Sequence, residues 1–400
     1  MKIKTLIYLH DTLGLGRLKR NLKLANALVS AFPEMSIRIV TGSSRADYFD
    51  YPNRTNYLNL PPLIKTGDNE YSARHDQDDT ESIMRERSDM LLKTVTEYEP
   101  DIFIIDHSHL AMIDEFLPAL KWNKENNSGC VNIFGMREII DDPEKVVNQW
   151  TGLGVYQIMR DYYDHVLIYG DRDIYNSAEL YNFPEDLKTK TDYCGYIVDP
   201  YSSLISKKSE NARKRITVTI GGGEWYGDVI IKNYINMLAR FKQEIDFNTT
   251  IITGPGLPDE YWSEFKEKSK NLDIDLHRFV SNTPEILSNS DLVIATAGYN
   301  TITDILSFAQ KAIIIPRVKF RTEQLIRAKL FNDLGIIKML TAEEVSPDTL
   351  YKAICDLMNN NDTLILKARE DNRIDLNGTE KACSHIARFL TKSKVGIADE

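Results

Sequence analysis

The feature that most constrains the fold is a short apolar run, Asp291–Ala295, which breaks at Gly298 and gives way to a helical pattern. The run predicts a buried strand, and the helix is expected to start at Asn300 or Thr301. Thr301 and Asp304 have the spacing of a capping box. A glycine turn that opens a helix exposes backbone N–H groups at the positive end of the helix dipole, which suits a phosphate or diphosphate. Asp304, expected in the first helical turn, is well placed to accept hydrogen bonds from a ribose.

The same alternation of strands and helices runs along the whole chain. Strands are expected at 5–9, 37–41, 102–105, 130–134, 165–169, 216–220, 249–253, 275–279, 292–295 and 312–315, with helical patterns between most of them. Strands separated by helices imply mostly parallel sheets with helices on both faces. Residues 65–82 are polar and acidic and are predicted as a long loop. The predicted fold class is α/β, with two Rossmann-like doubly wound domains facing a cleft.

A polar and charged segment at 199–214 is the predicted linker between these domains. The N-terminal domain is expected over 1–198 and the C-terminal domain over 215–380. Residues 381–400 are expected to form a C-terminal helix and tail, and packing back on the N-terminal domain is one arrangement open to them. Two domains suit a chain of 400 residues.

Composition excludes some classes of function. The formal net charge of −10 argues against a nucleic-acid-binding surface. The four cysteines are far apart without metal-ligand spacing, as expected in a reducing compartment. No run approaches the roughly 18 apolar residues that span a bilayer. The basic and apolar start of the chain is too short for a signal peptide and predicts a first strand. The sequence therefore predicts a cytoplasmic protein without a transmembrane segment.

Two further glycine loops follow predicted strands. The first loop contains Gly14 and Gly16, which are followed by Arg17, and precedes the first predicted helix. The second loop, Gly221–Gly223, precedes a predicted helix of the second domain. The first loop lacks the spacing of a P-loop or of a G-x-G-x-x-G fingerprint, so a tight turn is the alternative to ligand binding. Three consecutive glycines indicate positive φ or close approach of a ligand. Glycine turns at equivalent strand ends of both domains indicate a ligand-binding site more specifically together than any one of them does alone.

Histidines and carboxylates also follow predicted strands. His10 ends the first strand and is a candidate general base, because imidazole titrates near neutral pH. His107 and His109 follow Asp106. Three roles are open to these histidines: catalysis or substrate binding, a structural role in the loop, and metal binding together with Asp106. Arg137 and Glu138 end another strand, either as an ion pair or as site residues.

These residues resemble a known family pattern. The chain looks like a two-domain GT-B glycosyltransferase of the family 28 type, the branch that includes the bacterial lipid-II N-acetylglucosaminyltransferase and its uncharacterised bacterial relatives. The resemblance is loose except at motifs, which lie at Gly14–Gly16, Phe134–Pro143, Asp291–Thr301, Ile313–Pro316, Glu323–Gln324 and Asn332–Gly335.

The resemblance implies roles for the donor side. Asp304 stands where an acidic residue holds the ribose hydroxyls, and Glu323 and Gln324 stand where side chains hold hydroxyls of the donor sugar. Backbone groups at Phe279 and Val280 would meet the nucleobase. The diphosphate side of the site is expected to involve Gly222, Gly223, Gly298, Asn300 and Thr301. Such enzymes use no cofactor and usually no metal, because the helix dipole and backbone N–H groups stabilise the departing diphosphate.

The acceptor side departs from the family pattern. Relatives commonly have a histidine after the first glycine pair, and here Arg17 occupies that position. The guanidinium of an arginine cannot act as a base at neutral pH. Either another residue takes the proton, or Arg17 binds an anionic acceptor, or the activity differs. The acceptor-side candidates are Gly14, Gly16, Arg17 and Arg137, and the candidate bases are His10, His107, Asp11 and Glu138.

The predicted activity is transfer of a sugar from a UDP- or dTDP-sugar to a small-molecule or lipid-linked acceptor, with inversion and without metal. The alternatives are a nucleotide-sugar epimerase or hydrolase of the same fold, and a degenerate, non-catalytic GT-B partner subunit. The sequence predicts no nucleic-acid partner and leaves the oligomeric state open.

Overall fold

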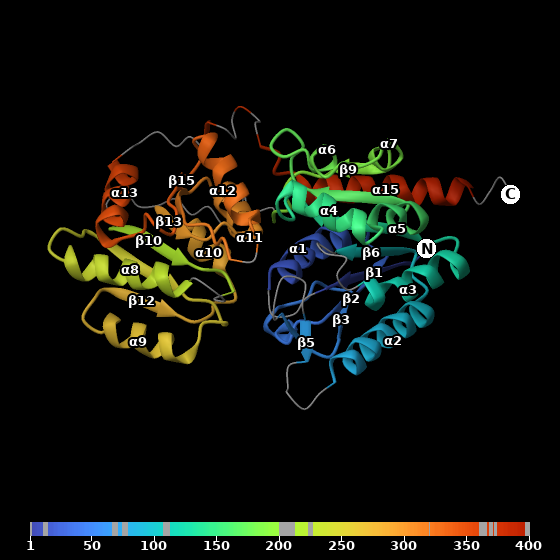
Figure 1. Cartoon of the computed structure of the whole chain (residues 1–400), viewed down its shortest axis with the longest axis horizontal. Helices are drawn as coiled ribbons and strands as arrows, with labels where there is room; N and C mark the ends of the chain where they lie inside the picture. Colours follow the sequence, from blue (N-terminus) through green and yellow to red (C-terminus); the bar gives the residue numbers. More distant parts are fainter. Residues whose placement is uncertain are drawn as a thin grey trace. The chain divides into compact units, whose positions relative to one another are not determined.

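The computed structural model describes residues 2–10, 15–65, 71–73, 79–106, 113–199, 213–222, 227–319, 321–359, 366–367, 371 and 374–396. The chain divides into two compact units. Unit 1 is Met1–Asp199 with Asn377–Glu400, and unit 2 is Pro200–Leu376. Each unit contains its own parallel sheet, and the two are described separately (Figure 1). The α/β fold class predicted from the sequence is confirmed.

Unit 1 is built on a seven-stranded parallel sheet in the order β3-β2-β1-β6-β7-β8-β9. Its central strands are buried on both faces, which explains their near-continuous apolar sequences. The strands are β1 (Ile3–Leu9), β2 (Met35–Thr41), β3 (Thr55–Asn59), β6 (Ile102–Asp106), β7 (Val131–Arg137), β8 (His165–Tyr169) and β9 (Thr191–Tyr193).

The helices of unit 1 join these strands, as a doubly wound fold requires. Helix α2 packs against α3, and α1 packs against α15. Asp79 caps α2 by accepting hydrogen bonds from the backbone N–H groups of Glu81 and Ser82. The helices are α1 (Gly16–Ala31), η1 (Ala46–Tyr48), α2 (Thr80–Tyr98), α3 (Ile113–Asn126), α4 (Pro143–Gly152), α5 (Val155–Tyr162), α6 (Ser177–Leu180), α7 (Glu185–Lys188) and α15 (Gly378–Gly396).

The C-terminal helix α15 belongs to unit 1 although it follows unit 2 in sequence. Gly378 donates its N–H to the Tyr196 carbonyl at 3.1 Å, and a Cβ at this glycine would lie 2.3 Å from the same oxygen. Only glycine therefore fits where the helix begins. Further along, the Phe389 ring stacks on His165 of β8 with centroids 3.4 Å apart. The division thus falls at residues 376 and 377, a few residues before the boundary expected at 380.

Unit 2 is built on a six-stranded parallel sheet in the order β12-β11-β10-β13-β14-β15. Helix α8 packs against α9 and α13 over a continuous apolar core, and α10 packs against α11. The elements are β10 (Lys214–Thr219), α8 (Gly227–Arg240), β11 (Phe247–Ile252), α9 (Asp259–Ser269), β12 (Ile274–His277), α10 (Thr283–Ser288), β13 (Leu292–Ala295), α11 (Tyr299–Phe308), β14 (Lys311–Ile314), α12 (Glu323–Asp333), β15 (Lys338–Met339) and α13 (Pro347–Asn359).

The prediction of a long loop at 65–82 is partly wrong. An antiparallel pair forms there between β4 (Leu63–Lys65) and β5 (Tyr71–Ala73), and α2 already begins at Thr80. Ala73 is buried and donates its N–H to the Thr80 hydroxyl, so the end of β5 is tied to the start of α2. Such short strands carry too little apolar alternation to be recognised against the surrounding acidic residues. Within the described residues, no helix is long and apolar enough to cross a membrane.

Candidate functional site

The strand order of unit 2 reverses between β10 and β13, which are hydrogen-bonded neighbours with Thr219 opposite Ala295. Helices leave the sheet in opposite directions on the two sides of this point, so the carboxyl ends of these strands leave a crevice in which ligands of such folds bind. Both glycine turns that the sequence analysis selected in the second half of the chain follow these two strands.

The turn after β10 is open around its glycines. Gly221 has φ of +68°, and a Cβ at Gly221 or at Gly222 would meet nothing within 4 Å. The Gly222 carbonyl accepts a hydrogen bond from the Gly256 N–H at 2.8 Å, which ties this turn to the connection after β11. Gly223, the third glycine predicted for the site, lies outside the described residues.

The turn after β13 differs from its predicted form. Helix α11 begins at Tyr299 with Gly298 as its N-cap, and no side chain caps it. Thr301 is therefore the third helical residue, so the capping box with Asp304 is wrong. Asp304 lies in the second turn rather than the first and is only 7% exposed. The helix starts earlier because the glycine itself, in extended conformation, serves as the cap.

The start of α11 is nevertheless accessible from the turn. A Cβ at Gly298 would find its nearest neighbour, the Thr301 hydroxyl, only at 3.9 Å. Asn300 and Thr301 are half-buried in the first helical turn. The first backbone N–H groups of a helix lack intrahelical partners, so this turn presents donors beside the positive end of the dipole.

Arg327 of α12 fixes the same turn, and the sequence analysis missed it. Its side chain is 1% exposed, its Nη1 donates to the Ala297 carbonyl at 2.9 Å, and its guanidinium lies over the Tyr299 ring. A buried guanidinium thereby holds the residues just before the helix start. An arginine four residues after Glu323 on one helix face was the available signal, because residues four apart lie on the same side of a helix.

Glu323 and Gln324, the predicted sugar-binding pair, begin α12 and are both buried. The Gln324 Oε1 accepts the backbone N–H of Arg317 at 3.1 Å, and the Glu323 carboxylate lies 3.7 Å from the Arg317 guanidinium. The structure thus brings both residues to the carboxyl edge of the sheet, where they also organise the connection that precedes them.

Phe279 and Val280 follow β12, which lies two strands from β10 in the sheet. Both are half-buried, and the Val280 carbonyl accepts a hydrogen bond from the Thr283 hydroxyl at 3.4 Å. The predicted strand at 275–279 ends earlier, at His277, so both residues belong to the connection to α10. They therefore lie at the same carboxyl edge as the glycine turns but not next to them.

Unit 1 has its own switch point between β1 and β6, where Leu9 pairs with Asp106. His10 follows Leu9 directly, is 1% exposed, and has its ring edge-on to Tyr71 with centroids 5.1 Å apart. The structure thus places His10 and Asp106 on neighbouring strand ends. The other predicted residues of these two connections, Asp11, Gly14, His107 and His109, lie outside the described residues.

Asp106 is already held by protein groups. Arg20 of α1 donates to both of its carboxylate oxygens at 2.6 and 2.8 Å, and the Asn21 side chain donates to one of them. All three side chains are buried. The carboxylate therefore anchors α1 to the end of β6, which favours a structural role over the metal site considered from the sequence.

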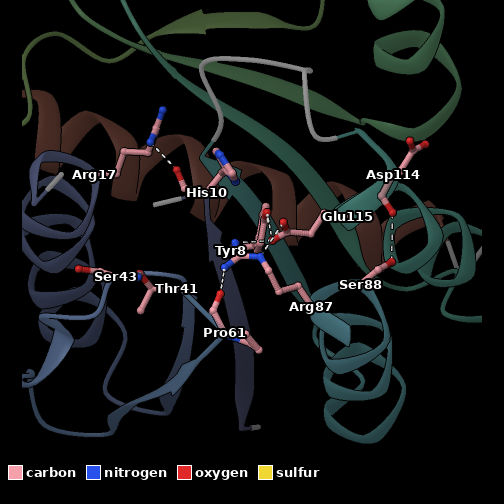
Figure 2. Close-up of polar contacts among 10 residues, drawn as sticks. All are labelled: Tyr8, His10, Arg17, Thr41, Ser43, Pro61, Arg87, Ser88, Asp114 and Glu115. Atoms are coloured by element: carbon pink, nitrogen blue, oxygen red, sulfur yellow. Dashed lines mark hydrogen bonds and ion pairs between the residues drawn. The ribbon is translucent and has the colours of Figure 1, made fainter. Parts of the chain in front are cut away.

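Arg17 lies in the first turn of α1, next to the exposed Gly16, and is half-buried. Its Nη1 donates to the carbonyl of His10, as Figure 2 shows. The N-cap of α1 is Leu15, which offers no capping side chain, and the first turn contains no acidic residue. This guanidinium is therefore fixed beside the end of β1, together with the positive end of the helix dipole.

Arg137 ends β7 and Glu138 follows it, and the Arg137 Nη2 donates to the Ile140 carbonyl at 3.4 Å. Glu138 is fully buried, and its backbone carbonyl accepts the Ser177 hydroxyl. A Cβ at Gly170 would lie 2.3 Å from the Glu138 Cβ, so glycine is required beside it.

A buried polar cluster beneath His10 escaped the sequence analysis. The Glu115 carboxylate accepts the Tyr8 hydroxyl at 2.6 Å and the Arg87 guanidinium at 2.8 and 2.9 Å, and Arg87 also donates to the Pro61 carbonyl (Figure 2). Burial, and then the Glu115 charge, raise the pKa of Tyr8 well above its usual value. Burial opposes the charged form of Arg87, but Glu115 outweighs it and the pKa of Arg87 rises. The cluster joins β1, α2, α3 and the connection after β3.

The connection after β8 contains an Asp-x-Asp pair, so the sequence does have this motif after a strand, although the metal-independent activity was predicted on the reading that it has none. Asp171 and Asp173 follow Gly170, and the Asp171 Oδ1 accepts the Asp173 N–H at 2.9 Å. This is an Asx turn, in which an aspartate stabilises its own loop.

Comparison with known proteins agrees with these features. Residues 217–386 match the glycosyltransferase family 28 C-terminal domain. An N-acetylglucosamine transferase of Lactococcus lactis, which acts on N-acetylmuramyl-(pentapeptide) pyrophosphoryl-undecaprenol with UDP-N-acetylglucosamine, is 25% identical over 191 residues, covering 47% of this chain and 51% of its own length. The chain therefore spans about half the length of this curated relative. An uncharacterized glycosyltransferase of Methanosarcina mazei is 25% identical over 282 residues, covering 67% of each chain.

The solved structures match over nearly the whole chain. The glycosyltransferase SnogD of Streptomyces nogalater superposes with a TM-score of 0.64 at 13% identity, covering 98% of this chain and 100% of that one. At this identity the likeness concerns the fold alone. The chain thus has the GT-B fold of two Rossmann-like units, as the resemblance predicted.

The sequence match bears on the family. The segment from β10 into α15 matches the glycosyltransferase family 28 C-terminal domain. The resemblance to family 28 that the motifs predicted is confirmed over this segment.

Proposed function

We propose that the chain is a glycosyltransferase that moves a sugar from a nucleotide-diphosphate sugar, with UDP or dTDP leaving, to an acceptor nucleophile. The observation that carries this proposal is the open glycine turn before α11, at the switch point of a family 28 C-terminal domain. The family match favours transfer over epimerisation, hydrolysis or a non-catalytic role.

The half of the site that binds the donor would use backbone N–H groups and a helix dipole. The N–H groups at the start of α11 and the turn at Gly222 would hold the diphosphate, and their dipoles would stabilise the charge that develops as it leaves. Asp304 would accept the ribose hydroxyls. Glu323 and Gln324 would contact the donor sugar, and backbone groups at Phe279 and Val280 would meet the nucleobase.

The reaction would be a single displacement with inversion. The acceptor oxygen forms a bond to the anomeric carbon while the bond from that carbon to the diphosphate oxygen breaks, and the acceptor proton passes to a base. His10 leads the candidate bases because it ends β1 at the switch point of unit 1. Its ring lies against Tyr71, so this role requires the β4–β5 pair to move aside for the acceptor. Asp11, His107 and Glu138 remain candidates, and Glu138 is as deeply buried as His10.

Arg17 would bind the acceptor rather than take its proton. A guanidinium stays protonated at neutral pH, and this one is fixed beside the end of β1 by its bond to the His10 carbonyl. An acceptor with a phosphate or carboxylate, small or lipid-linked, would suit it. The N–H groups at Gly16 and the side chain of Arg137 are the remaining acceptor-side candidates. The proposed location is the cytoplasm.

A nucleotide-binding experiment tests the donor half. A thermal-shift screen of nucleotides and nucleotide sugars should identify UDP or dTDP, since a ligand at 100 times its dissociation constant adds about 2.7 kcal/mol to the free energy of unfolding. Asp304→Ala should then weaken binding of that nucleotide in calorimetric titration. Asp333→Ala, an exposed acid at the far end of α12, is the matched control. Unchanged affinity in Asp304→Ala would remove Asp304 from the site.

Turnover distinguishes the reaction types. Release of the nucleotide from its sugar should depend on an added acceptor. Release at the same rate without acceptor would indicate a hydrolase, and interconversion of the intact donor would indicate an epimerase.

A further inference from the structure

One residue contacts both members of the predicted sugar-binding pair. Arg317 follows Pro316 in the connection between β14 and α12. Its backbone N–H donates to the Gln324 Oε1 at 3.1 Å. Its guanidinium Nη2 lies 3.7 Å from the Glu323 Oε1, which is longer than a hydrogen bond and within the range of an ion pair. Arg317 therefore holds the start of α12 through its backbone and through its charge.

The side chain of Arg317 is directed toward Glu323. Its exposed fraction is 27%, and its Nε is buried and has no hydrogen-bond partner among the described residues. The Glu323 side chain is only 5% exposed. Because opposite charges attract more strongly away from water, this ion pair restricts both side chains more than an exposed pair would.

The contact with the backbone of Arg317 also fixes the orientation of the Gln324 amide. Gln324 is 8% exposed, and its amide oxygen accepts the Arg317 N–H. In the part of the chain that the structure describes, no residue accepts a hydrogen bond from its amide nitrogen. Buried donors in proteins normally have partners, so this nitrogen is suited to donate to a ligand.

The connection that contains Arg317 is tied to the turn before α11. Ile315, two residues before Arg317, donates its N–H to the Ala295 carbonyl at 2.8 Å. Further along the chain, Arg327 of α12 donates to the Ala297 carbonyl at 2.9 Å. The residues before and after Arg317 are thus hydrogen-bonded to the segment that leaves β13 and leads into α11, where the diphosphate is proposed to bind.

From these contacts we propose that Arg317 is a positioning residue for the donor sugar. It acts through Glu323, whose carboxylate it holds in the orientation that accepts hydroxyls of the sugar, and it does not contact the nucleotide. The inference rests on the proposed function, in which Glu323 and Gln324 contact the sugar, and adds a residue to that site. A side chain that is already ordered by a charged neighbour loses less free energy when it binds a ligand.

Affinities of the full chain for a nucleotide and for its sugar test this role. The probes are UDP and whichever of UDP-glucose, UDP-galactose and UDP-N-acetylglucosamine stabilises the chain most in a thermal-shift screen, or dTDP and dTDP-glucose if dTDP is preferred. In calorimetric titration, Arg317→Met should weaken binding of the nucleotide sugar by about tenfold, while affinity for the free nucleotide changes less than about threefold. Lys329→Met, which removes an exposed cation from α12, is the matched control and should change neither affinity.

Two further variants separate positioning from a purely structural role. Arg317→Lys keeps the positive charge and should retain most of the affinity for the nucleotide sugar. In a Glu323→Gln background, Arg317→Met should weaken the nucleotide sugar by less than about twofold, because a residue that acts through Glu323 then has no carboxylate to orient. A general loss of structure would instead lower both affinities together, with the same effect in either background.

The outcomes distinguish the failure of this inference from the failure of the proposed function. Unchanged affinity for the nucleotide sugar in Arg317→Met, or an equal loss with and without the Glu323 carboxylate, overturns the positioning role and leaves the proposed function intact. Equal weakening of nucleotide and nucleotide sugar would assign Arg317 to the nucleotide and also overturn it. Failure of every nucleotide to bind the wild-type chain would overturn both. A thermal unfolding scan shows whether each variant is folded, and Arg317→Gln, with the same expected result, replaces Arg317→Met if that variant does not fold.

Discussion

Removing one partner of the buried cluster in unit 1 should be strongly destabilising. Arg87 and Glu115 are both completely buried, 2.8 Å apart, and Arg87 reaches Pro61 as well. In Arg87→Met the carboxylate of Glu115 loses its counter-charge while the Tyr8 hydroxyl alone continues to donate to it. An uncompensated buried charge is costly because it has given up its hydration without a partner.

The magnitude follows from the burial. Breaking a buried ion pair by removing one partner costs about 3–5 kcal/mol of the free energy of unfolding, whereas an exposed pair contributes about 0–1 kcal/mol. For a unit of this size about 1 kcal/mol lowers the melting temperature by about 2–4 °C, so the expected decrease is on the order of 6–20 °C. That is a large fraction of the roughly 5–15 kcal/mol that stabilises a typical domain.

Thermal and urea unfolding, followed by circular dichroism, measure the effect. Lys93→Met on the same helix is the matched control, because its pair with Glu97 is 74% and 63% exposed, and it should change stability by less than about 1 kcal/mol. Replacing all three members, with Arg87→Met, Glu115→Leu and Tyr8→Phe, should recover most of the loss because no charge is then left buried. If Arg87→Met behaves like Lys93→Met, the cluster does not hold unit 1 together as described.

Three further predictions concern the base, the metal and pH. Substitution of the true base should lower turnover by about 10²-fold or more at nearly unchanged nucleotide affinity; near-full turnover in every single alanine variant would refute the set His10, Asp11, His107 and Glu138. Activity should survive EDTA, because the helix dipole and backbone N–H groups are proposed to stabilise the leaving group; loss of activity that Mg²⁺ or Mn²⁺ restores would direct attention to Asp171 and Asp173. Burial lowers the pKa of His385 on α15. The charge of Asp192 raises this pKa, and the charges of Arg388 and Lys381 lower it further. Because the pKa of His385 is lower in the folded state than in the unfolded state, the neutral ring stabilises the fold above about pH 6.5, and this stabilisation is lost as the pH falls below that value. The melting temperature should therefore drop more between pH 7.5 and 5.5 in the wild type than in His385→Gln, and an equal drop would contradict this assignment.

The sheet strands were the most predictable part of the fold. The strands 165–169 and 292–295 begin and end where the apolar runs do, because buried parallel strands are nearly continuous apolar segments between polar turns. The strands β3, β9 and β15 were missed. They lie at or next to the sheet edges, and their partly exposed sequences have no such run. The α15 helix was expected, but its place on unit 1 depends on contacts such as Phe389 with His165.

The candidate site was predictable only in part. Glycine turns after β10 and β13 follow from local backbone chemistry, so their positions in the chain were found without the structure. The predicted start of α11 was wrong because it relied on the capping-box spacing of Thr301 and Asp304. The helix is instead capped by Gly298, which only the backbone geometry reveals. Arg327 and Glu115 were not recognised from the sequence, because their partners, Ala297 and Arg87, lie about thirty residues away in the chain.

The sequence by itself determined the alternation of strands and helices, the glycine turns and the resemblance to family 28, because each depends on short stretches of chain whose patterns are local. Only the tertiary structure decided which strand ends are neighbours, since hydrogen bonds pair Leu9 with Asp106 and Thr219 with Ala295 across long separations in the chain. It likewise decided which charges are buried together, because the partners of Arg87, Asp106 and Arg327 are set by packing rather than by spacing.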